Sequence, residues 1–523
     1  MVDFKGNRKL KTFLLAFGVV FFSYVAFLNP TFTTDSVWDS FDTEIRPYSF
    51  FQTLSGGRFL QFFFRYACYL FNKIHISKFE NQYVFQILTM LFIAWTVAVL
   101  VDIFEELSSY KNRVGLTFIF LISFVNPLFI ETFVYVGLEL AIAILMVAYA
   151  TKLFAKKHYV CAGFLVLCAV GTYQSYVQLF LIYGLLVIYL QADKRINAIS
   201  VKRGLGLIFT AGIPSVISVL SINVYTILSG ANNYVMTASS AEAGSTFSDV
   251  TKQVSFSDGI LARIKHMIYV YEVTVGKMFG MYPTLFLFVL LIIVAVVTLY
   301  ALIKKNESKA KGITYLLTFI LLNIFPFALF GLSVRTSPAP RICWIIFASV
   351  SALTLIMVDT VSMIEKNTVL KYLQRAVVVI FTVVNLYSIT TCELDFFIGN
   401  ALDKQIVYQV QAEIDRYEAE SGNKITQVCT YRSDNTDFYY EQQFLNPYFE
   451  YTYNHKTIFF DWGDVELLDK VTGNNYADCS WYNTYPDDYE EVIKENFEGK
   501  DWSTFIADEQ LIFRGDTLYW AIY

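Results

Sequence analysis

The sequence predicts a polytopic α-helical membrane protein that ends in an α/β domain. Hydrophobic residues make up 55% of the 523-residue chain and charged residues only 16%, whereas an average soluble protein carries about 25% charged residues. Several apolar stretches reach the ~18 residues that a helix needs to cross the hydrocarbon core of a bilayer. Residues 392–523 carry a net charge of −17, which leaves +12 for residues 1–391. The chain therefore divides into a basic membrane domain and an acidic domain outside the hydrocarbon.

Hydropathy predicts about eleven membrane-spanning helices in the basic domain. They cover residues 12–29, 82–102, 114–130, 132–151, 159–173, 176–192, 205–228, 283–303, 313–332, 342–362 and 373–390. Lys and Arg gather before the first span and in every second connection after it, and short cytoplasmic loops carry such an excess of positive charge. The N-terminus is therefore expected in the cytoplasm, and the odd number of spans puts the acidic domain outside. The loops 30–81, 229–282 and 333–341 fall on the same outer face.

Local patterns refine the parts outside these spans. In residues 57–72 and 262–279, polar residues recur near helical spacing among aromatic residues, which is typical of helices lying on a membrane surface or facing other protein with their polar stripe. In the acidic domain, residues 401–420 have the apolar spacing of a helix. Residues 424–432 alternate like a strand, and residues 510–523 form a predicted hairpin.

The sequence lacks the motifs of a nucleotide-driven or metal-dependent protein. It has no phosphate-binding glycine loop, none of its seven cysteines forms a CxxC pair, and its four histidines lack metal-ligand spacing. We therefore predict no metal, no other cofactor and no nucleic-acid partner. Cys429 and Cys479 both fall in the outer domain, where they either form a disulfide or remain two free thiols.

Carboxylates and arginines are predicted to converge on the outer face. The acids and other polar residues there are Asp35, Asp42, Glu44, Glu131, Tyr173 and Gln174, and the arginines are Arg58, Arg335 and Arg341. Arginine binds phosphate bidentately, and a carboxylate can take the proton of a hydroxyl group. Phosphate and hydroxyl chemistry at a membrane surface, without a nucleotide motif, indicates sugar transfer from a lipid-phosphate donor.

Several short motifs follow one another along nearly the whole chain. They are Asn29 to Asp35-Ser36, "GGRFLQFFFR", "NPLFIETFVY", "GTYQSY", an Arg–Pro–Arg loop before a late span, and "NLYSITTCELDFFIGNALDKQIVYQVQAEI" leading into the last domain. Their order resembles that of the Gtr-type (type II) bacterial membrane glucosyltransferases. The resemblance implies a GT-C fold and an undecaprenyl-phosphate sugar as donor.

The resemblance also implies roles for the outer residues. GT-C enzymes place a catalytic acid in the first outer loop, a role that falls to Asp35, with Asp42 and Glu131 as further catalytic candidates. The arginines would hold the donor phosphate, and Tyr173, Gln174 and Glu44 would contact substrate. The implied activity is inverting transfer of a hexose, in this family glucose, to a cell-envelope glycan such as O-antigen or wall glycan. It would occur on the outer face of the bacterial cytoplasmic membrane.

Two other functions share some of these features. A flippase or transporter of a lipid-linked glycan would carry paired charges at mid-membrane, but Glu139 is the main intramembrane acid and has no obvious basic partner in the sequence. A polysaccharide polymerase would use a diphosphate-linked donor, and a large soluble C-terminal domain is less expected there. For the transferase, the expected partners are the lipid-linked donor, the glycan acceptor and the bilayer, with a companion flippase and a donor synthase.

Overall fold

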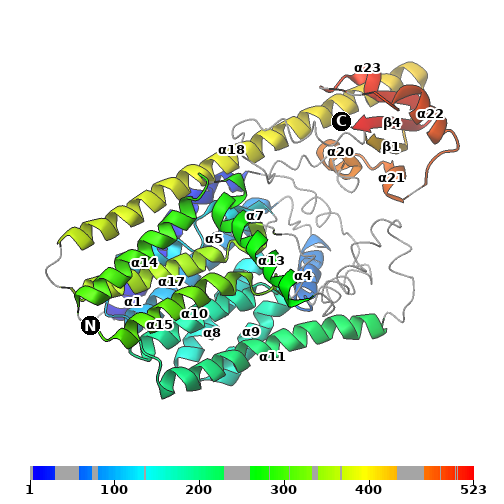
Figure 1. Cartoon of the computed structure of the whole chain (residues 1–523). Helices are drawn as coiled ribbons and strands as arrows, with labels where there is room; N and C mark the ends of the chain where they lie inside the picture. The colour runs from blue at the N-terminus through cyan, green and yellow to red at the C-terminus, as the bar shows by residue number, and fades with distance from the viewer. Residues whose placement is uncertain are drawn as a thin grey trace.

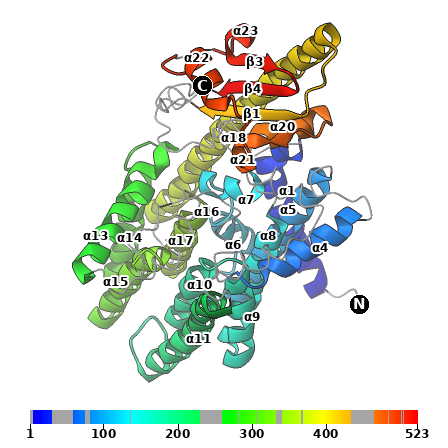
Figure 2. The same cartoon turned by 90° about the vertical axis from the view of Figure 1, so that its right-hand side faces the viewer.

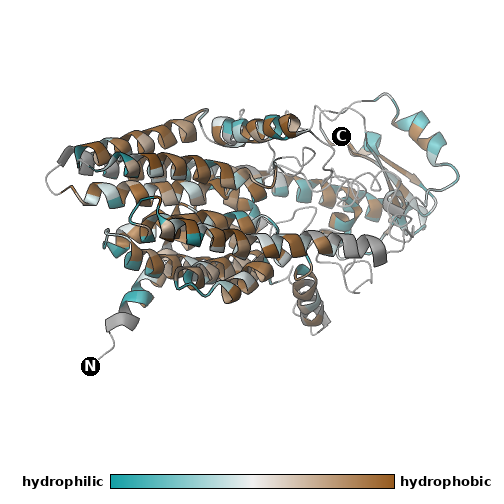
Figure 3. Cartoon of the chain, turned by 60° about the horizontal axis from the view of Figure 1, so that its bottom comes forward, coloured by the Kyte–Doolittle hydropathy of each residue, from teal (hydrophilic) through white to brown (hydrophobic). Residues whose placement is uncertain are grey.

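The chain forms a bundle of long helices with a small β-sheet beyond one end (Figure 1). The structure is a computed structural model. It describes residues 4–29, 58–73, 81–134, 137–228, 259–281, 283–305, 307–331, 338, 340–364, 368–432, 464–482, 484–500, 502 and 504–522. The bundle helices are mostly apolar along their length, whereas polar residues gather towards the sheet (Figure 3).

The long helices of the bundle follow the predicted spans closely. They are α1 (Phe4–Tyr24), α5 (Gln82–Leu107), α8 (Leu138–Ala155), α9 (Tyr159–Thr172), α10 (Tyr176–Gln191), α11 (Ala198–Leu228), α14 (Phe286–Lys304), α15 (Lys309–Ile324), α17 (Ile346–Ser362) and α18 (Thr368–Ser421). Among the described residues, seven helical segments are long and apolar enough to cross a membrane, and α9 and α10 are shorter apolar helices. The class of helical membrane protein is thus supported.

Shorter elements complete the bundle. They are η1 (Val25–Leu28), α4 (Gln61–Lys73), α6 (Arg113–Leu121), η2 (Pro127–Phe129), α7 (Ile130–Val134), α13 (Ile260–Tyr271), η3 (Glu272–Lys277), η4 (Met278–Gly280), η5 (Phe325–Phe327) and α16 (Pro340–Cys343). Helices α4 and α13 fall within or across the two predicted amphipathic segments. Both lie at the end of the bundle that faces the sheet (Figure 1).

The prediction of one continuous span over residues 114–130 is wrong. Helix α6 ends at Leu121, the chain turns, and η2 and α7 follow as separate short helices. Pro127 has no backbone N–H and disfavours a helical conformation at the residue before it. Asn126 accordingly has an extended backbone (φ −157°, ψ 156°), and its side chain accepts a hydrogen bond from the N–H of Phe129.

Helix α17 lies among the other helices of the bundle (Figure 2). Of its most apolar stretch, 94% of the residues are buried inside the protein, against 33% for α1. A helix that is apolar on all sides is suited to such a central position, because it has no polar face to turn outward. The peripheral helices instead leave large apolar side chains exposed, as a lipid environment allows.

Ion pairs tie the helix ends together at the end of the bundle where the chain begins. Asp102 of α5 pairs with Arg113 and, at 3.0 Å, with Lys9 of α1. Deeper in the protein, Lys194 lies 2.5 Å from a carboxylate oxygen of Asp359, and both side chains are buried. The Lys9–Asp102 and Lys194–Asp359 pairs connect segments that lie far apart in the sequence.

Helix α18 runs unbroken for 54 residues, through the predicted domain boundary at residues 391 and 392, and carries the sheet on its far end (Figure 1). The strands are β1 (Gln427–Arg432), β2 (Ala477–Asp478), β3 (Leu511–Arg514) and β4 (Thr517–Ile522), in the order β2-β1-β4-β3. Strand β1 is parallel to β2 and β4, and β3 and β4 form an antiparallel hairpin. Helices α20 (Asp464–Thr472), α21 (Cys479–Tyr482), α22 (Tyr489–Asn496) and α23 (Ala507–Gln510) surround it. The predicted helix, strand and C-terminal hairpin are therefore confirmed.

We expect the Lys194–Asp359 pair to be essential for stability. Replacing Lys194 by Met leaves a buried carboxylate without its cation, a change that costs about 3–5 kcal/mol. The midpoint of thermal unfolding in detergent should fall accordingly. The matched control is Lys9→Met, because Lys9 is 59% exposed and Asp102 keeps Arg113, so its cost should stay below about 1 kcal/mol. Equal shifts in the two variants would contradict this assignment.

Candidate functional site

Five of the predicted site residues fall in the part of the chain that the structure describes: Glu131, Arg58, Arg341, Tyr173 and Gln174. Asp35, Asp42, Glu44 and Arg335 lie outside the described residues. The geometry of the site is therefore built here from the first five residues and from the elements that hold them.

The turn between α6 and η2 is fixed by a buried tyrosine. The hydroxyl of Tyr24, at the end of α1, donates to the carbonyl of Phe124 (2.8 Å) and accepts from the N–H of Asn126 (3.1 Å). The ring of Tyr24 stacks on Phe133 with the ring centroids 4.3 Å apart. Gln86 of α5 donates to the carbonyl of Phe133 (2.5 Å). These contacts place α7, and with it Glu131, against α1 and α5.

Glu131 links α7 to α16, across 210 positions of the sequence. One carboxylate oxygen accepts a hydrogen bond from the backbone N–H of Arg341 (2.5 Å), and the other lies 4.0 Å from the Arg341 guanidinium. The Glu131 side chain is buried, whereas that of Arg341 is 40% exposed. Glu131 thus satisfies an N–H at the start of α16, where intrahelical partners are missing, and it brings negative charge to an arginine that remains accessible.

Arg58 lies over the end of α9. Its guanidinium carbon is 4.7 Å from the centroid of the Tyr173 ring, a cation–π geometry. The N–H of Leu60 donates to the carbonyl of Gly171 (2.8 Å). A Cβ at Gly171 would come within 2.5 Å of the Phe59 ring, so a glycine at this position lets the segment that carries Arg58 pack closely on α9.

Aromatic residues connect the two arginines. The Tyr173 ring lies 5.6 Å from that of Tyr176, which in turn lies 6.3 Å from Trp344. Trp344 follows Arg341 by one helical turn, and its ring is 4.9 Å from that of Phe129, two residues before Glu131. The structure therefore brings two pairs, Arg58 with Tyr173 and Glu131 with Arg341, to one end of the bundle. A series of neighbouring aromatic rings lies between the two pairs.

Two aromatic residues of this region, Tyr176 and Trp344, were not predicted as site residues. Tyr176 is the last residue of the "GTYQSY" motif, of which only Tyr173 and Gln174 were assigned a role. Trp344 lies in an apolar run, and its spacing of three residues from Arg341 is the one sequence feature that links it to the site.

Gln174 is held in the site by a long hydrogen bond. Its amide donates to the hydroxyl of Ser218 on α11 at 3.5 Å, the long limit of a hydrogen bond. One turn further along α10, Gln178 is fully buried and neither polar atom of its side chain has a hydrogen-bond partner in the described part of the chain. Buried amides without partners are uncommon. The Gln178 side chain on α10 can therefore still form hydrogen bonds with a bound molecule or with water.

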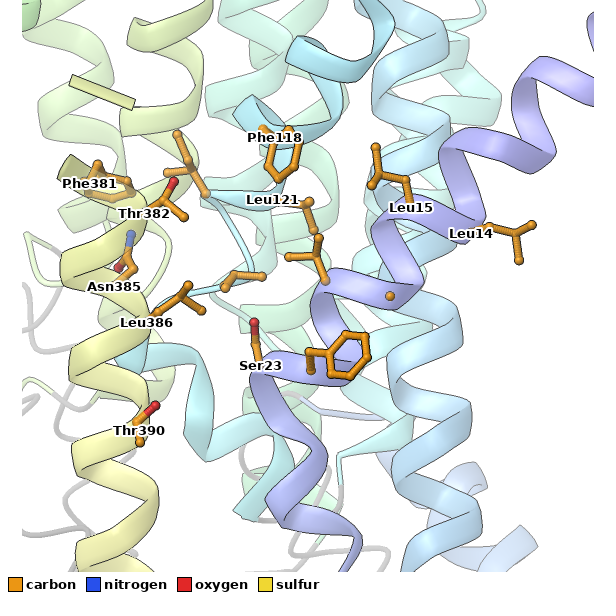
Figure 4. Close-up of a pocket in the computed structure, with 15 residues that line it drawn as sticks. Leu14, Leu15, Ser23, Phe118, Leu121, Phe381, Thr382, Asn385, Leu386 and Thr390 are labelled. Carbon is orange, nitrogen blue, oxygen red and sulfur yellow. The ribbon is translucent and has the colours of Figure 1, made fainter. Parts of the chain in front are cut away.

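An apolar groove runs between α1, α6 and α18, with a volume of about 680 Å³. Figure 4 shows Leu14 and Phe381 towards one end and Ser23 and Thr390 towards the other. Ser23 precedes Tyr24, whose hydroxyl holds the turn before Glu131. The groove therefore ends next to the elements that position Glu131.

The described residues contain no group of three or more His, Cys, Asp or Glu side chains arranged to hold a metal ion. The charged groups gathered here are arginines and single carboxylates. Such a set can bind an anionic group and move a proton.

The fold and this site define a helical membrane protein with arginines, carboxylates and aromatic rings collected at one end. Residues 36–358 match the model of the family Glucosyl transferase GtrII, and the chain belongs to this family. The comparison with curated proteins and the comparison with solved structures gave no match. The resemblance to the Gtr-type transferases is confirmed, and membership supports glycosyl transfer as the activity. The matched region contains Arg58, Glu131 and Arg341 and ends within α17.

We expect Gly171→Ala to impair sugar transfer. The new Cβ would push the Phe59 ring away and move Arg58 with it, and misplacement of a positioning group by about 1 Å can cost on the order of 10²-fold in rate. The control is Gly163→Ala on the same helix, where a Cβ would lie 3.8 Å from its nearest neighbour. Transfer assays on the two purified variants compare them directly, and equal activity would show that the contact at Gly171 does not position Arg58.

Proposed function

We propose that this protein is an inverting glycosyltransferase that moves a hexose, in line with its family glucose, from undecaprenyl-phosphate sugar to a cell-envelope glycan. The observation that carries the proposal is the placement of Arg58, Arg341 and Glu131 at one end of the bundle, together with an apolar groove that ends next to the elements that position Glu131. A lipid-phosphate sugar has matching parts: an isoprenoid chain, an anionic phosphate and a sugar.

The groove suits an isoprenoid chain. Its lining is mainly aliphatic and aromatic, with Ser23, Thr382, Asn385 and Thr390 as the polar exceptions. A chain lying between α1 and α18 would bring its phosphate to the Ser23 and Thr390 end, near the turn that precedes Glu131. Arg341, 40% exposed, and Arg58 would supply positive charge to the phosphate.

In the proposed reaction the acceptor hydroxyl loses its proton to a carboxylate and attacks the anomeric carbon of the sugar. The bond from this carbon to the phosphate oxygen breaks on the opposite face, which inverts the configuration. The leaving polyprenyl phosphate gains negative charge, which the arginines stabilise. The rings of Tyr173, Tyr176 and Trp344 offer an apolar surface against which a sugar ring can lie.

The geometry of Glu131 argues for a supporting role. One of its oxygens already accepts from the Arg341 N–H and the other faces the guanidinium, and a nearby positive charge makes a carboxylate a weaker base. We therefore assign the general base to the first outer loop, to Asp35 as the resemblance implies, with Asp42 as the alternative. Asp35 directly precedes the matched region.

The outer face of the bacterial cytoplasmic membrane is the proposed location of the site. The arginine and carboxylate end lies opposite the end where α1 begins, and the basic loops with their ion pairs gather at that N-terminal end. With these loops in the cytoplasm, the sheet and the site face outward, where nucleotide sugars are absent and a lipid-linked donor is needed. A flippase would then deliver the donor made by a synthase on the inner face.

We expect Asp35→Asn to reduce the chemical step by about 10²–10⁴-fold, because the variant keeps the shape of the side chain but removes the base. Donor binding should survive. Arg58→Ala should instead weaken donor binding, since it removes a charge-assisted contact worth about 1.5–3 kcal/mol. Single-turnover rates and donor titrations separate the two defects. Near-normal turnover by Asp35→Asn, with Asp42→Asn or Glu131→Gln inactive, would move the base to one of those positions.

We expect Gly18→Leu to raise the KM for the lipid donor. Gly18 lines the groove and has open space where a Cβ would be, so a leucine fills the groove without a clash. The control is Gly212→Leu on α11, where a Cβ also meets nothing within 4 Å outside the groove. KM is measured for both variants with a long-chain donor and with a short-chain analogue. The KM for the long-chain donor should be higher in Gly18→Leu than in Gly212→Leu, and the KM for the short-chain analogue should be the same in both. An unchanged KM in Gly18→Leu would place the isoprenoid chain elsewhere.

A further inference from the structure

Cys429 lies in β1, and Cys479 directly follows β2, the neighbouring strand of the sheet at the end of α18. Strands β1 and β2 are parallel, with Gln427 opposite Ala477 and Val428 opposite Asp478. The next step of this register puts Cys429 opposite Cys479, the first residue of α21. Neighbouring strands are about 4.8 Å apart, which is within the Cα separation of about 4.4–6.8 Å that a disulfide requires.

Both cysteine side chains also face the same way. They belong to one buried cluster with Val492, Phe497 and Tyr519, whereas Val428 packs into the core on the other face of the sheet. The Cys479 thiol donates to the side-chain oxygen of Gln427 at 3.4 Å, and Gln427 is two residues from Cys429 and therefore on the same face of β1. The neighbouring Cys479 thiol and burial raise the pKa of Cys429, and the neighbouring Cys429 thiol lowers the pKa of Cys479. Both cysteines are free thiols in this structure.

We propose that Cys429 and Cys479 form a structural disulfide that joins β1 to the start of α21. The sequence alone left this pairing open. The cell location of the bond rests on the proposed outward orientation, because disulfides persist in oxidising compartments, whereas the pairing itself rests on the register and the shared cluster alone.

The bond forms by exchange with an external disulfide. The Cys479 thiolate attacks one sulfur of that disulfide and releases the first thiol. The Cys429 thiol then loses its proton to solvent, and the resulting thiolate attacks the Cys479 sulfur of this mixed disulfide, breaks its bond to the external sulfur and releases the second thiol, which takes up a proton. Two protein thiols are thus oxidised, and the external disulfide is reduced to two thiols. Both side chains are at most 1% exposed, so exchange takes place while the sheet is forming or transiently open, and the finished bond is shielded from reductants.

The bond would constrain a long stretch of chain. It closes a loop of about 50 residues that includes α20, and a disulfide stabilises mainly by restricting the unfolded chain, the more so for long loops. In the folded sheet it would add a covalent link at β2, which has only two residues and is the weakest edge of the sheet.

Peptide mapping of the full-length protein tests the proposal. The protein is taken from cells, its free thiols are alkylated under denaturing conditions, and it is digested with trypsin without reductant. Cleavage after Lys424, Arg432, Lys470 and Lys494 should give residues 425–432 linked to residues 471–494, and dithiothreitol should separate them. Reduction should also lower the unfolding midpoint of the sheet by about 5–15 °C. Cys161→Ser, on the exposed surface of α9, should retain the linked peptide, and Cys429→Ser should lose it.

Two results would overturn the proposal in different ways. If both cysteines are alkylated even after treatment with oxidised glutathione in mild denaturant, the pairing is wrong. If the linked peptide forms only after that treatment and not in cells, the sheet does not face an oxidising compartment, which overturns the disulfide in the cell together with the outward orientation. Neither result depends on sugar transfer, so a transferase assay on the same sample judges the proposed activity separately.

Discussion

The site depends on a backbone break that the protein must satisfy from within. Between α6 and η2 the chain leaves the helix while still surrounded by other helices, where unsatisfied backbone groups are costly. The Tyr24 hydroxyl and the Asn126 side chain supply the missing hydrogen bonds. Because the chain turns here, Glu131 starts a new short helix and can reach α16. The position of Arg341 and Trp344 follows from that contact, and Trp344 then packs against Tyr176 beside Arg58.

The two ends of the bundle differ in how far their charged side chains are buried. At the N-terminal end, buried Lys194 and Asp359 neutralise each other, and Asp359 also accepts from the N–H groups of Ser109 and Tyr110. This buried pair has a structural role. At the other end, Glu131 is buried but its arginine partner is partly exposed, so positive charge stays accessible to an anion. This asymmetry is what a transferase needs if one end holds the fold and the other binds a phosphate.

Much of the fold could be predicted because its signals are local. Apolar runs predicted most of the helices, and the pattern of residues 510–523 predicted the C-terminal hairpin. The break at Asn126-Pro127 was visible as "NP", yet hydropathy averaged over a window treats a turn between apolar residues as one span. The contact of Glu131 with Arg341 and the parallel pairing of β1 with β4 join residues far apart in sequence, so no local pattern encodes them. Trp344 was missed because an aromatic residue in an apolar run has the same appearance whether it packs or faces a ligand, and Tyr176, although part of "GTYQSY", begins such a run.

Helix α18 connects the groove to the sheet without interruption. Five residues between Phe381 and Thr390 line the groove, and from Ile406 onwards the same helix packs into the core of the sheet. An α-helix rises 1.5 Å per residue, so about 24 Å of helix separate Thr390 from Ile406. That distance carries the sheet well beyond the end of the groove, which fits an acidic domain that stands clear of the hydrocarbon. The same continuous helix therefore forms one wall of the groove and packs into the core of the sheet, even though the family match ends before α18 begins.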